Sequence, residues 1–280
     1  MFLKIYRKVM DIILKIVSES LLSFYPAMVK YINFPIINQL WARVTVYTLI
    51  AFFFMNKKIG FQLIFSSIGL LLAFVSVIHI WTSYLGFKNL DAGVSYSIFY
   101  IYPLLIILFS GNPFSIKYII PLIGVGLLTY SGWINNEKNN NFVLGISGII
   151  GATLTEVWLY FIVKKMNITN KWNVLFISYL LPTIIFTLVL NKNIIPQKND
   201  DKWKKNVILM LLGNAIIGAL GYYLRYYTIS RLPSRIYGVL SYFGIVMAYV
   251  YGWFLNKEEL SWIKIIGSGI ILISSLLFIH

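Results

Sequence analysis

Long apolar segments recur along the whole chain, and they constrain its fold more than any other feature of the sequence. A helix that crosses the roughly 30 Å apolar core of a bilayer needs about 20 residues. Of the 280 residues, 59% are hydrophobic and 12% are charged, whereas soluble domains hold about 45–50% and 25%. We therefore expect an all-α integral membrane protein. Its ten transmembrane helices are expected at roughly 9–29, 36–55, 61–86, 92–110, 116–134, 142–163, 172–190, 206–228, 234–255 and 260–279.

One helix–turn–helix stretch occurs twice, at residues 84–110 and again at residues 226–252. Tyr100 and Tyr242 correspond at a spacing of 142, as do several neighbouring positions. A repeat of this length predicts two related five-helix halves. Because five is odd, the second half must be inserted upside down, and inverted repeats are typical of secondary transporters. The two repeats are expected over residues 1–136 and 137–280.

The net charge of +15 comes mostly from lysines and arginines that lie between the apolar segments. Such residues hold loops at the anionic face of a membrane, so they indicate topology here rather than nucleic-acid binding. If the N-terminus is cytoplasmic, Lys57 and Lys164 fall inside and Lys30 and Lys257 fall outside, which predicts cytoplasmic N- and C-termini. The loop over residues 191–205 disagrees, because its five lysines then lie outside. Plasma and organelle membranes both remain open.

The sequence carries no signature of catalysis or of metal binding. It has no cysteine, which excludes disulfides, cysteine–zinc sites and thiol chemistry. It also lacks a phosphate-binding loop, the HExxH pattern and the Gly-x-Ser-x-Gly pattern. We therefore expect no enzyme activity, no cofactor and no metal.

Charged residues inside the apolar segments are the first candidates for a functional site. Each is costly in lipid and usually faces a cavity or a partner. Lys15 and Glu19 are four residues apart and so share one helical face. Glu19 and Glu156 each follow a hydroxyl residue, in helices that correspond across the repeat. Two such carboxylates could bind a cation or exchange a proton for substrate.

Two arginines, Arg43 and Arg225, also lie inside apolar segments. Arginine stays protonated, so each needs a carboxylate, carbonyl oxygens or an anionic ligand. The functional interpretation is that they bind a substrate anion. The structural alternative consists of ion pairs, of Glu19 with Lys15 or Arg43 and of Glu156 with Arg225.

Polar and aromatic residues complete the predicted substrate- or proton-binding set. Tyr96 and Tyr100 share one face of the fourth segment, and with Tyr242 they could line a central cavity or simply pack between helices. Asn214 could bond across helices or to substrate. His79 is more simply interpreted as a satisfied polar contact.

The second half resembles a known family over LPSRIYGVLSYFGIVMAYVYGWFLNKEELSWIKIIGSGIILISSLL, residues 232–277. This run has a small-residue turn, an apolar helix, a loop similar to Gly-Glu at residues 256–259, and a glycine-containing last helix. It is similar to the EamA-like ten-helix transporters of the drug/metabolite transporter superfamily. The proline usual in the ninth helix is absent, and Gly244 or Ile245 stands there. The resemblance implies export or exchange of small metabolites around a cavity lined by helices 1, 3, 4, 6, 8 and 9.

We therefore interpret the chain as a secondary transporter, an exporter or exchanger of a small polar or amphipathic metabolite. Protons or a counter-substrate would couple the transport, which would proceed by alternating access. Two alternatives remain, an organellar nucleotide-sugar or sugar-phosphate antiporter and a non-transporting membrane scaffold. The antiporter would need cavity cations, for which the candidates are Arg225, Arg231, Arg235 and Lys88. The expected partners are the substrate and the lipid bilayer, with no nucleic acid, for a monomer or a homodimer.

Overall fold

The structure, a computed structural model, describes residues 2–111, 117, 119–136, 141–190, 205–259 and 261–276. Over these ranges it is built of α-helices without any β-strand, which confirms the all-α prediction. The helices are α1 Phe2–Tyr31, α2 Ile36–Phe54, α3 Lys57–Ile64, α4 Ser67–Asn89, α5 Ala92–Phe99, α6 Tyr102–Phe109, α7 Ile119–Asn136, α8 Asn141–Met166, α9 Lys171–Val189, α10 Lys205–Ile229, α11 Ser234–Ser241, α12 Phe243–Asn256 and α13 Trp262–Leu276. Residues 191–204, most of the predicted lysine-rich loop, lie outside the described ranges.

Eight stretches of the described chain are long and apolar enough to cross a bilayer. Most are single helices, and two join consecutive short helices, α5 with α6 and α11 with α12. Two shorter apolar helices, Ile119–Ser131 and Trp262–Ile271, stand where the fifth and tenth spans are expected. The chain is thus a multi-pass membrane protein, and the count of ten spans stays a prediction.

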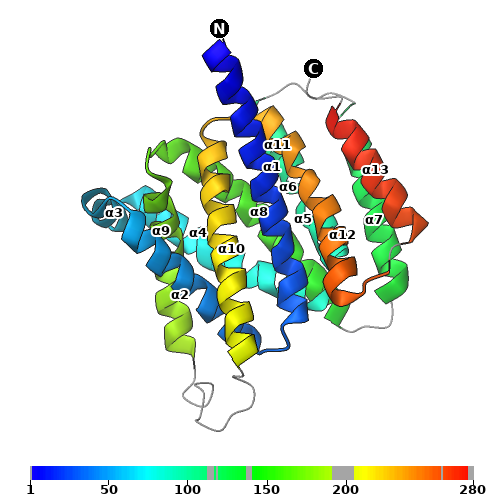
Figure 1. Ribbon diagram of the computed structural model, residues 1–280, viewed down its shortest axis with the longest axis horizontal. Coiled ribbons are helices and arrows are strands. Elements are labelled where there is room, and N and C mark those ends of the chain that lie inside the picture. Colours follow the sequence, from blue (N-terminus) through cyan, green and yellow to red (C-terminus); the bar gives the residue numbers. More distant parts are fainter. Residues whose placement is uncertain are drawn as a thin grey trace.

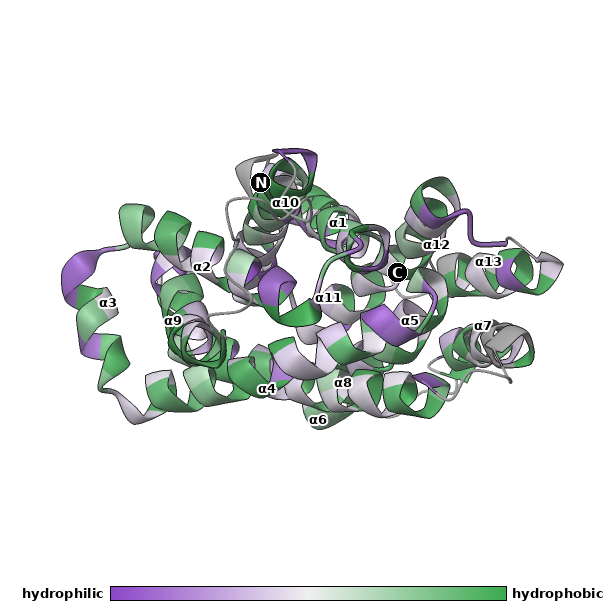
Figure 2. Cartoon of the chain, turned by 90° about the horizontal axis from the view of Figure 1, so that it is seen from below, coloured by the Kyte–Doolittle hydropathy of each residue, from purple (hydrophilic) through white to green (hydrophobic). Residues whose placement is uncertain are grey.

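The surface of the helix bundle is apolar where lipid would cover it. Large side chains such as Phe53, Phe74, Trp158 and Leu188 are exposed. Figure 2 shows hydrophobic residues along the helices, while hydrophilic residues gather mainly near helix ends and in loops. An exposed apolar surface of this kind would favour aggregation in water. In a bilayer it would contact hydrocarbon tails, which are as apolar as these side chains.

The fourth expected span is broken into α5 and α6. Pro103 has no N–H, so it cannot donate to the carbonyl of Phe99, and the helix tightens here instead of continuing. Ile101 N–H donates to Ile98 O at 3.2 Å. The Thr153 hydroxyl of α8 lies 3.4 Å from Phe99 O and so partly satisfies that carbonyl. The break therefore has a local cause in the sequence.

The ninth expected span is broken at Tyr242, where α11 ends and α12 begins, without a proline. The cause is tertiary, because α1 and α5 approach the backbone just after the break. The Ser23 hydroxyl donates to Gly244 O at 2.8 Å. A Cβ at Gly244 would lie 2.2 Å from the Tyr100 hydroxyl oxygen, so no larger residue fits without movement.

The third expected span starts with a separate short helix, α3, and the long α4 follows it. Ser66 caps α4, because its side chain accepts a hydrogen bond from Gly69 N–H at 3.1 Å. The expected helix over 61–86 is therefore two helices, and the one that is long enough to span begins at Ser67.

Helix α1 lies in the middle of the bundle, between α10 and α12 (Figure 1). Helices α4 and α8 pack closely behind it, because glycines let their backbones meet. A Cβ at Gly148 would lie 2.8 Å from Thr82 O and 2.9 Å from Gly86 N. Helix α10 also contacts α8. This packing brings polar residues of α1, α4, α8 and α10 together inside the bundle.

Candidate functional site

Glu19 lies near the middle of α1 and is fully buried. One turn earlier, Lys15 donates to its Oε1 and forms an ion pair with it. The Tyr100 hydroxyl donates to its Oε2 from the break between α5 and α6. Arg225 Nη2 of α10 donates to the same oxygen at 2.9 Å. Three donors, two of them cationic, therefore stabilise Glu19 as a carboxylate.

Arg225 joins the two predicted halves. Its Nη2 contacts Glu19 of α1, and its Nη1 donates to Glu156 Oε1 of α8 at 2.8 Å. Arg225 is 1% exposed and Glu156 2% exposed, so this is an ion pair without solvent screening. The predicted pairs Glu19–Lys15 and Glu156–Arg225 are both present. The alternative pair of Glu19 with Arg43 is not, and Arg225 takes that position.

His79 of α4 extends the network beyond Glu156. Its Nδ1 lies 3.2 Å from Ala152 O and 3.1 Å from the Thr155 hydroxyl. A carbonyl oxygen only accepts, so Nδ1 carries the proton. Nε2 of the neutral ring then accepts a hydrogen bond from the Tyr222 hydroxyl at 3.1 Å.

The other face of His79 Nε2 meets Glu156 Oε2 at 3.4 Å. That oxygen has no hydrogen-bond donor in the part of the chain that the structure describes. Nε2 of the neutral ring has one lone pair, which already accepts from the Tyr222 hydroxyl, so no proton lies between Nε2 and Glu156 Oε2. A proton added to Nε2 would face Oε2, and this contact would then become a hydrogen bond.

Arg43 of α2 lies apart from both carboxylates. Its guanidinium carbon is 3.5 Å from the ring centroid of Tyr25 and 5.0 Å from that of Tyr47. The rings of Tyr84 and Tyr222 both lie at 5.7 Å. Arg43 is only 4% exposed, and among the described residues its Nε and Nη1 find no hydrogen-bond acceptor. It is a buried cation among tyrosine rings.

A small cavity of about 10 Å³ lies next to His79 and Arg225, and it is also lined by Tyr25 and Tyr222, whose rings contact Arg43. A cavity of this size holds about one water molecule. Tyr222 reaches both sides of it, since it bonds His79 and also contacts Arg43. The cavity is lined by Leu22, Tyr25, His79, Ser83, Phe87, Tyr96, Phe99, Tyr222 and Arg225.

The remaining predicted residues contribute unequally. Tyr96 lines the cavity and donates to Leu22 O of α1. Tyr242 is buried at the α11–α12 junction, and none of the described contacts links it to the ion-pair network. Asn214 is buried on α10, and its Oδ1 has no hydrogen-bond partner within the described ranges. Neither Tyr100 nor Tyr242 lines the small cavity next to His79 and Arg225.

Sequence reasoning missed two groups of this site. His79 is predicted to be a satisfied polar contact, and its bonds to Ala152, Thr155 and Tyr222 agree, but its contact with Glu156 was not predicted. Tyr222 is not among the site residues predicted from the sequence. Its contacts reach α2 and α4, so no local pattern in the sequence could reveal them.

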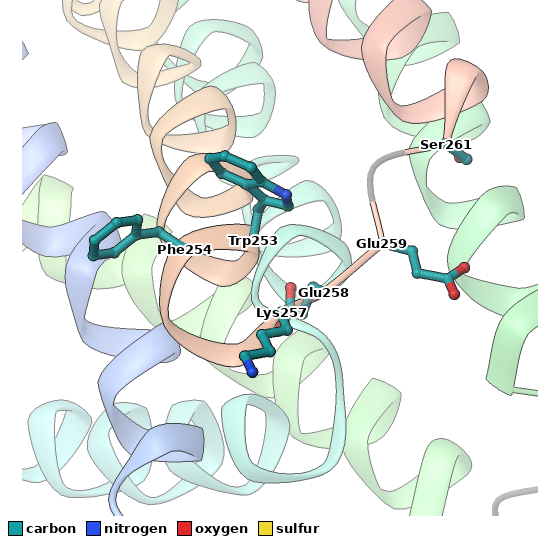
Figure 3. Close-up of a pocket in the computed structure, with 6 residues that line it drawn as sticks. All are labelled: Trp253, Phe254, Lys257, Glu258, Glu259 and Ser261. Carbon is teal, nitrogen blue, oxygen red and sulfur yellow. The ribbon is translucent and has the colours of Figure 1, made fainter.

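A second hollow, of about 600 Å³, opens at the loop after α12 and holds none of the predicted site residues (Figure 3). Glu258 of this loop accepts a hydrogen bond from Ala92 N–H, the first residue of α5, at 3.0 Å. Lys30 Nζ lies 3.6 Å from the same carboxylate oxygen. Glu258 therefore caps α5 and links it to α12, which gives the acidic residue of this loop a structural role. The residues that line this hollow are Trp253, Phe254, Lys257, Glu258, Glu259 and Ser261.

The model of the EamA-like transporter family matches residues 143–279. The second half of this chain is EamA-like. The finding confirms the resemblance seen in the sequence, and with the apolar helices it points to a membrane transporter rather than an enzyme. The EamA-like region contains Glu156 and Arg225, while Glu19, His79 and Arg43 precede it. No curated protein matches the chain.

Proposed function

We propose that this EamA-like protein is a secondary transporter that moves a small polar or amphipathic metabolite by alternating access. Its ten spans would form two inverted repeats, residues 1–136 and 137–280, with both termini in the cytoplasm. The protein would work as a monomer or a homodimer, with protons or a counter-substrate as the coupling partner.

The observation that carries this proposal is the buried ion network Lys15–Glu19–Arg225–Glu156. Buried ion pairs add little to the free energy of unfolding, because the cost of desolvating the charges offsets most of the Coulomb attraction. Inside a membrane they mark pathways for ions or substrates. This network also joins α1 of one predicted repeat to α8 and α10 of the other. A change in its charge would therefore act on the interface that must move in alternating access.

Glu156 and His79 are the groups best placed to take up a coupling proton. Glu19 is held ionised by Lys15 and Arg225, whereas Glu156 has one oxygen bound to Arg225 and the other facing His79. A proton on this pair would weaken the hold of Glu156 on Arg225, so binding of the proton and opening of the repeat interface would be linked.

The nucleotide-sugar alternative is less favoured, because it needs free cations around the cavity. Arg225 is occupied by two carboxylates. Arg231 lies near the start of α1, 3.7 Å from Asp11, and its side chain is 44% exposed.

Transport can be tested without knowing the substrate. Purified protein is reconstituted into liposomes, a mixture of small water-soluble metabolites is added outside, and the contents of the vesicles are analysed by mass spectrometry. We expect at least one metabolite to accumulate above protein-free liposomes, and more strongly under an imposed pH gradient. A scaffold predicts no accumulation under any gradient.

Two variants separate the roles of the carboxylates. Glu156→Gln should fold, exchange substrate and lose the response to the pH gradient. Glu19→Gln leaves Lys15 and Arg225 short of counter-charge, so it should lower the free energy of unfolding by about 3–5 kcal/mol. If both variants fold well and keep full gradient-driven uptake, the carboxylate mechanism is wrong.

The proton site has its own spectroscopic test, because the chain has only two histidines, His79 and His280. In ¹⁵N-histidine-labelled protein, His79 should hold its proton on Nδ1 at high pH. On acidification its Nε2 resonance should shift in wild type, and Glu156→Gln should change that titration. A His79 resonance that is unaffected by Glu156→Gln would contradict the shared site.

A further inference from the structure

Arg43 is a buried arginine that forms no ion pair with a carboxylate of the described residues. Arg225, by contrast, contacts both Glu19 and Glu156. Arg43 has four tyrosine rings within 5.7 Å of its guanidinium carbon and no ion pair with any carboxylate of the described chain. Rings satisfy the face of a guanidinium, but its N–H groups lie in its plane and need acceptors. Nε and Nη1 have none in the described ranges.

In the described chain, the buried charged residues of the ion network and Arg43 together carry one net positive charge. Lys15, Arg43 and Arg225 are cationic, Glu19 and Glu156 are anionic, and His79 is neutral in the tautomer that its contacts require. An uncompensated charge in this apolar interior is costly. A ligand with a single negative charge would neutralise it, whereas a phosphate dianion would need a second free cation.

The residues around Arg43 and the cavity indicate which chemical groups the ligand carries. The guanidinium presents a planar fork of donors, which matches the two oxygens of a carboxylate. Tyr25 contacts Arg43 and also lines the small cavity, as Tyr222 does. Phe87 and Phe99 line the same cavity, so a bound molecule would place an apolar body against aromatic rings.

We propose that Arg43 binds the carboxylate of the substrate, and that this substrate is a small monocarboxylate with an apolar or aromatic body. The inference rests on the proposed transport function and specifies its substrate class. The cavity holds about 10 Å³, so the ligand enters when the aromatic walls move apart, as alternating access requires.

Tyr222 connects this anion site to the proton site. Its hydroxyl donates to His79 Nε2, and its ring lies 5.7 Å from the Arg43 guanidinium carbon. A proton on His79 and Glu156 adds one positive charge next to the same cavity, which favours the anion. One monoanion carried with one proton moves no net charge, so uptake should respond to a pH gradient and not to membrane potential.

Binding is tested first, on purified full-length protein in detergent. The probes are acetate, butyrate, phenylacetate and indole-3-acetate, each measured beside its neutral amide by thermal unfolding. At least one of the two aromatic acids should raise the unfolding temperature while its amide does not. Inorganic phosphate is the comparison for an unspecific anion effect and should have no effect. Equal responses to acid and amide, a response to phosphate alone, or no response to any acid would overturn the proposal.

Variants then locate the site. Arg43→Gln should weaken binding of the stabilising acid by at least about 30-fold, because a buried charge pair is lost. Arg43→Lys should keep part of the binding affinity, since lysine retains the charge but lacks the planar pair of donors. Arg231→Gln, at a half-exposed arginine outside the cavity, should bind as wild type does. If Arg43→Gln does not fold, two results still test the proposal. They are the difference between the acid and its amide in wild type, and the affinity of Arg43→Lys for the acid.

The outcomes separate this proposal from the transport function. Acid binding that depends on Arg43 without uptake into liposomes would support the site and contradict transport. Uptake of neutral metabolites by a protein that ignores all four acids would support transport and contradict the site. Acid binding that survives Arg43→Gln would place the anion elsewhere and overturn the role of Arg43.

Discussion

Tyr100 and Tyr242 occupy equivalent positions in the two predicted repeats, yet their hydroxyl groups have different surroundings. The Tyr100 hydroxyl donates to the Glu19 carboxylate. The Tyr242 hydroxyl is buried and bonds to no atom of the described residues. A hydrogen bond to a charged group contributes about 1.5–3 kcal/mol, whereas removal of a buried hydroxyl without a partner is close to neutral.

We therefore expect Tyr100→Phe to lower the free energy of unfolding by about 1.5–3 kcal/mol, and Tyr242→Phe to leave it unchanged or raise it slightly. Chemical unfolding in detergent, followed by tryptophan fluorescence, measures both. The two variants are controls for each other, since each removes one hydroxyl group at a matched position. Equal losses in the two variants would contradict the contact between Tyr100 and Glu19.

Glu258 is a titratable group outside the spans, in the loop after α12. Burial raises the pKa of Glu258 above its ordinary value of 4.5, and the nearby Asp91 carboxylate acts in the same direction. The Ala92 N–H and the Lys30 and Lys264 ammonium groups act against this rise. Because its pKa is higher in the folded protein, the folded state holds the proton more tightly than the unfolded chain does.

The contribution of Glu258 to stability is therefore greatest below pH 4.5 and declines as the pH rises through the folded-state pKa. Each pKa unit of difference corresponds to about 1.4 kcal/mol. Glu258→Gln keeps an acceptor for Ala92 N–H and removes the titration, so its unfolding temperature should depend less on pH above 4.5. Glu259→Gln, at the exposed neighbour, should follow wild type. A wild-type pH profile in Glu258→Gln would contradict this assignment.

At the scale of elements, the contact between α4 and α8 depends on small residues. A Cβ at Gly148 would meet backbone atoms of α4, Thr82 O at 2.8 Å and Gly86 N at 2.9 Å. Backbone cannot rotate away as a side chain can, so the helices must separate. At Gly213 of α10 the same position meets no heavy atom of the described residues within 4 Å, apart from its own stretch of helix.

Gly148→Ala should therefore lower the free energy of unfolding by about 1–3 kcal/mol, the usual range for overpacking. Gly213→Ala should be neutral or slightly stabilising, because alanine is the better helix former. Thermal unfolding of the two purified variants gives the comparison. Similar losses would show that the α4–α8 approach is looser than the structure has it.

The positions of the helices could be predicted from the sequence, but not all of their breaks. Apolar runs of about 20 residues locate the spans because bilayer thickness fixes their length. The break between α5 and α6 was signalled by Pro103. The break at Tyr242 has no local signal, since its cause is the approach of Ser23 and Tyr100 to Gly244. The break between α3 and α4 is likewise marked by Ser66, which caps the start of α4 and which an apolar count does not detect.

The candidate site was predictable in its residues and less so in its pairing. Glu19, Glu156 and Arg225 stand out because charge is rare inside apolar segments. Which cation meets which carboxylate depends on how α1, α8 and α10 pack, and sequence spacing specifies only the Lys15–Glu19 pair. The position of Arg43, away from both carboxylates and among four tyrosines, is likewise set by tertiary packing.

At the scale of the whole molecule, the arrangement of helix ends bears on topology. In Figure 1, α1 begins and α13 ends on one side of the bundle, while α9 ends and α10 begins on the opposite side. This arrangement is the one that ten alternating spans would give, with both termini on the same side. The lysine distribution, apart from residues 191–205, predicts that this side is the cytoplasm.

Single cysteines test this orientation directly, because the natural chain has none. Lys57→Cys and Lys164→Cys should resist a membrane-impermeant maleimide in intact cells and react after permeabilisation, since both positions are predicted to be cytoplasmic. Lys257→Cys, in the exposed loop after α12, should react from outside. All three side chains are exposed in the structure, so a lack of reaction reports the side of the membrane rather than burial.

Labelling of Lys57→Cys from outside, with Lys257→Cys protected, would mean that the whole bundle is inserted the other way up. The cytoplasmic placement of both termini would then be wrong, while the proton and anion sites would keep their geometry and face the opposite gradients.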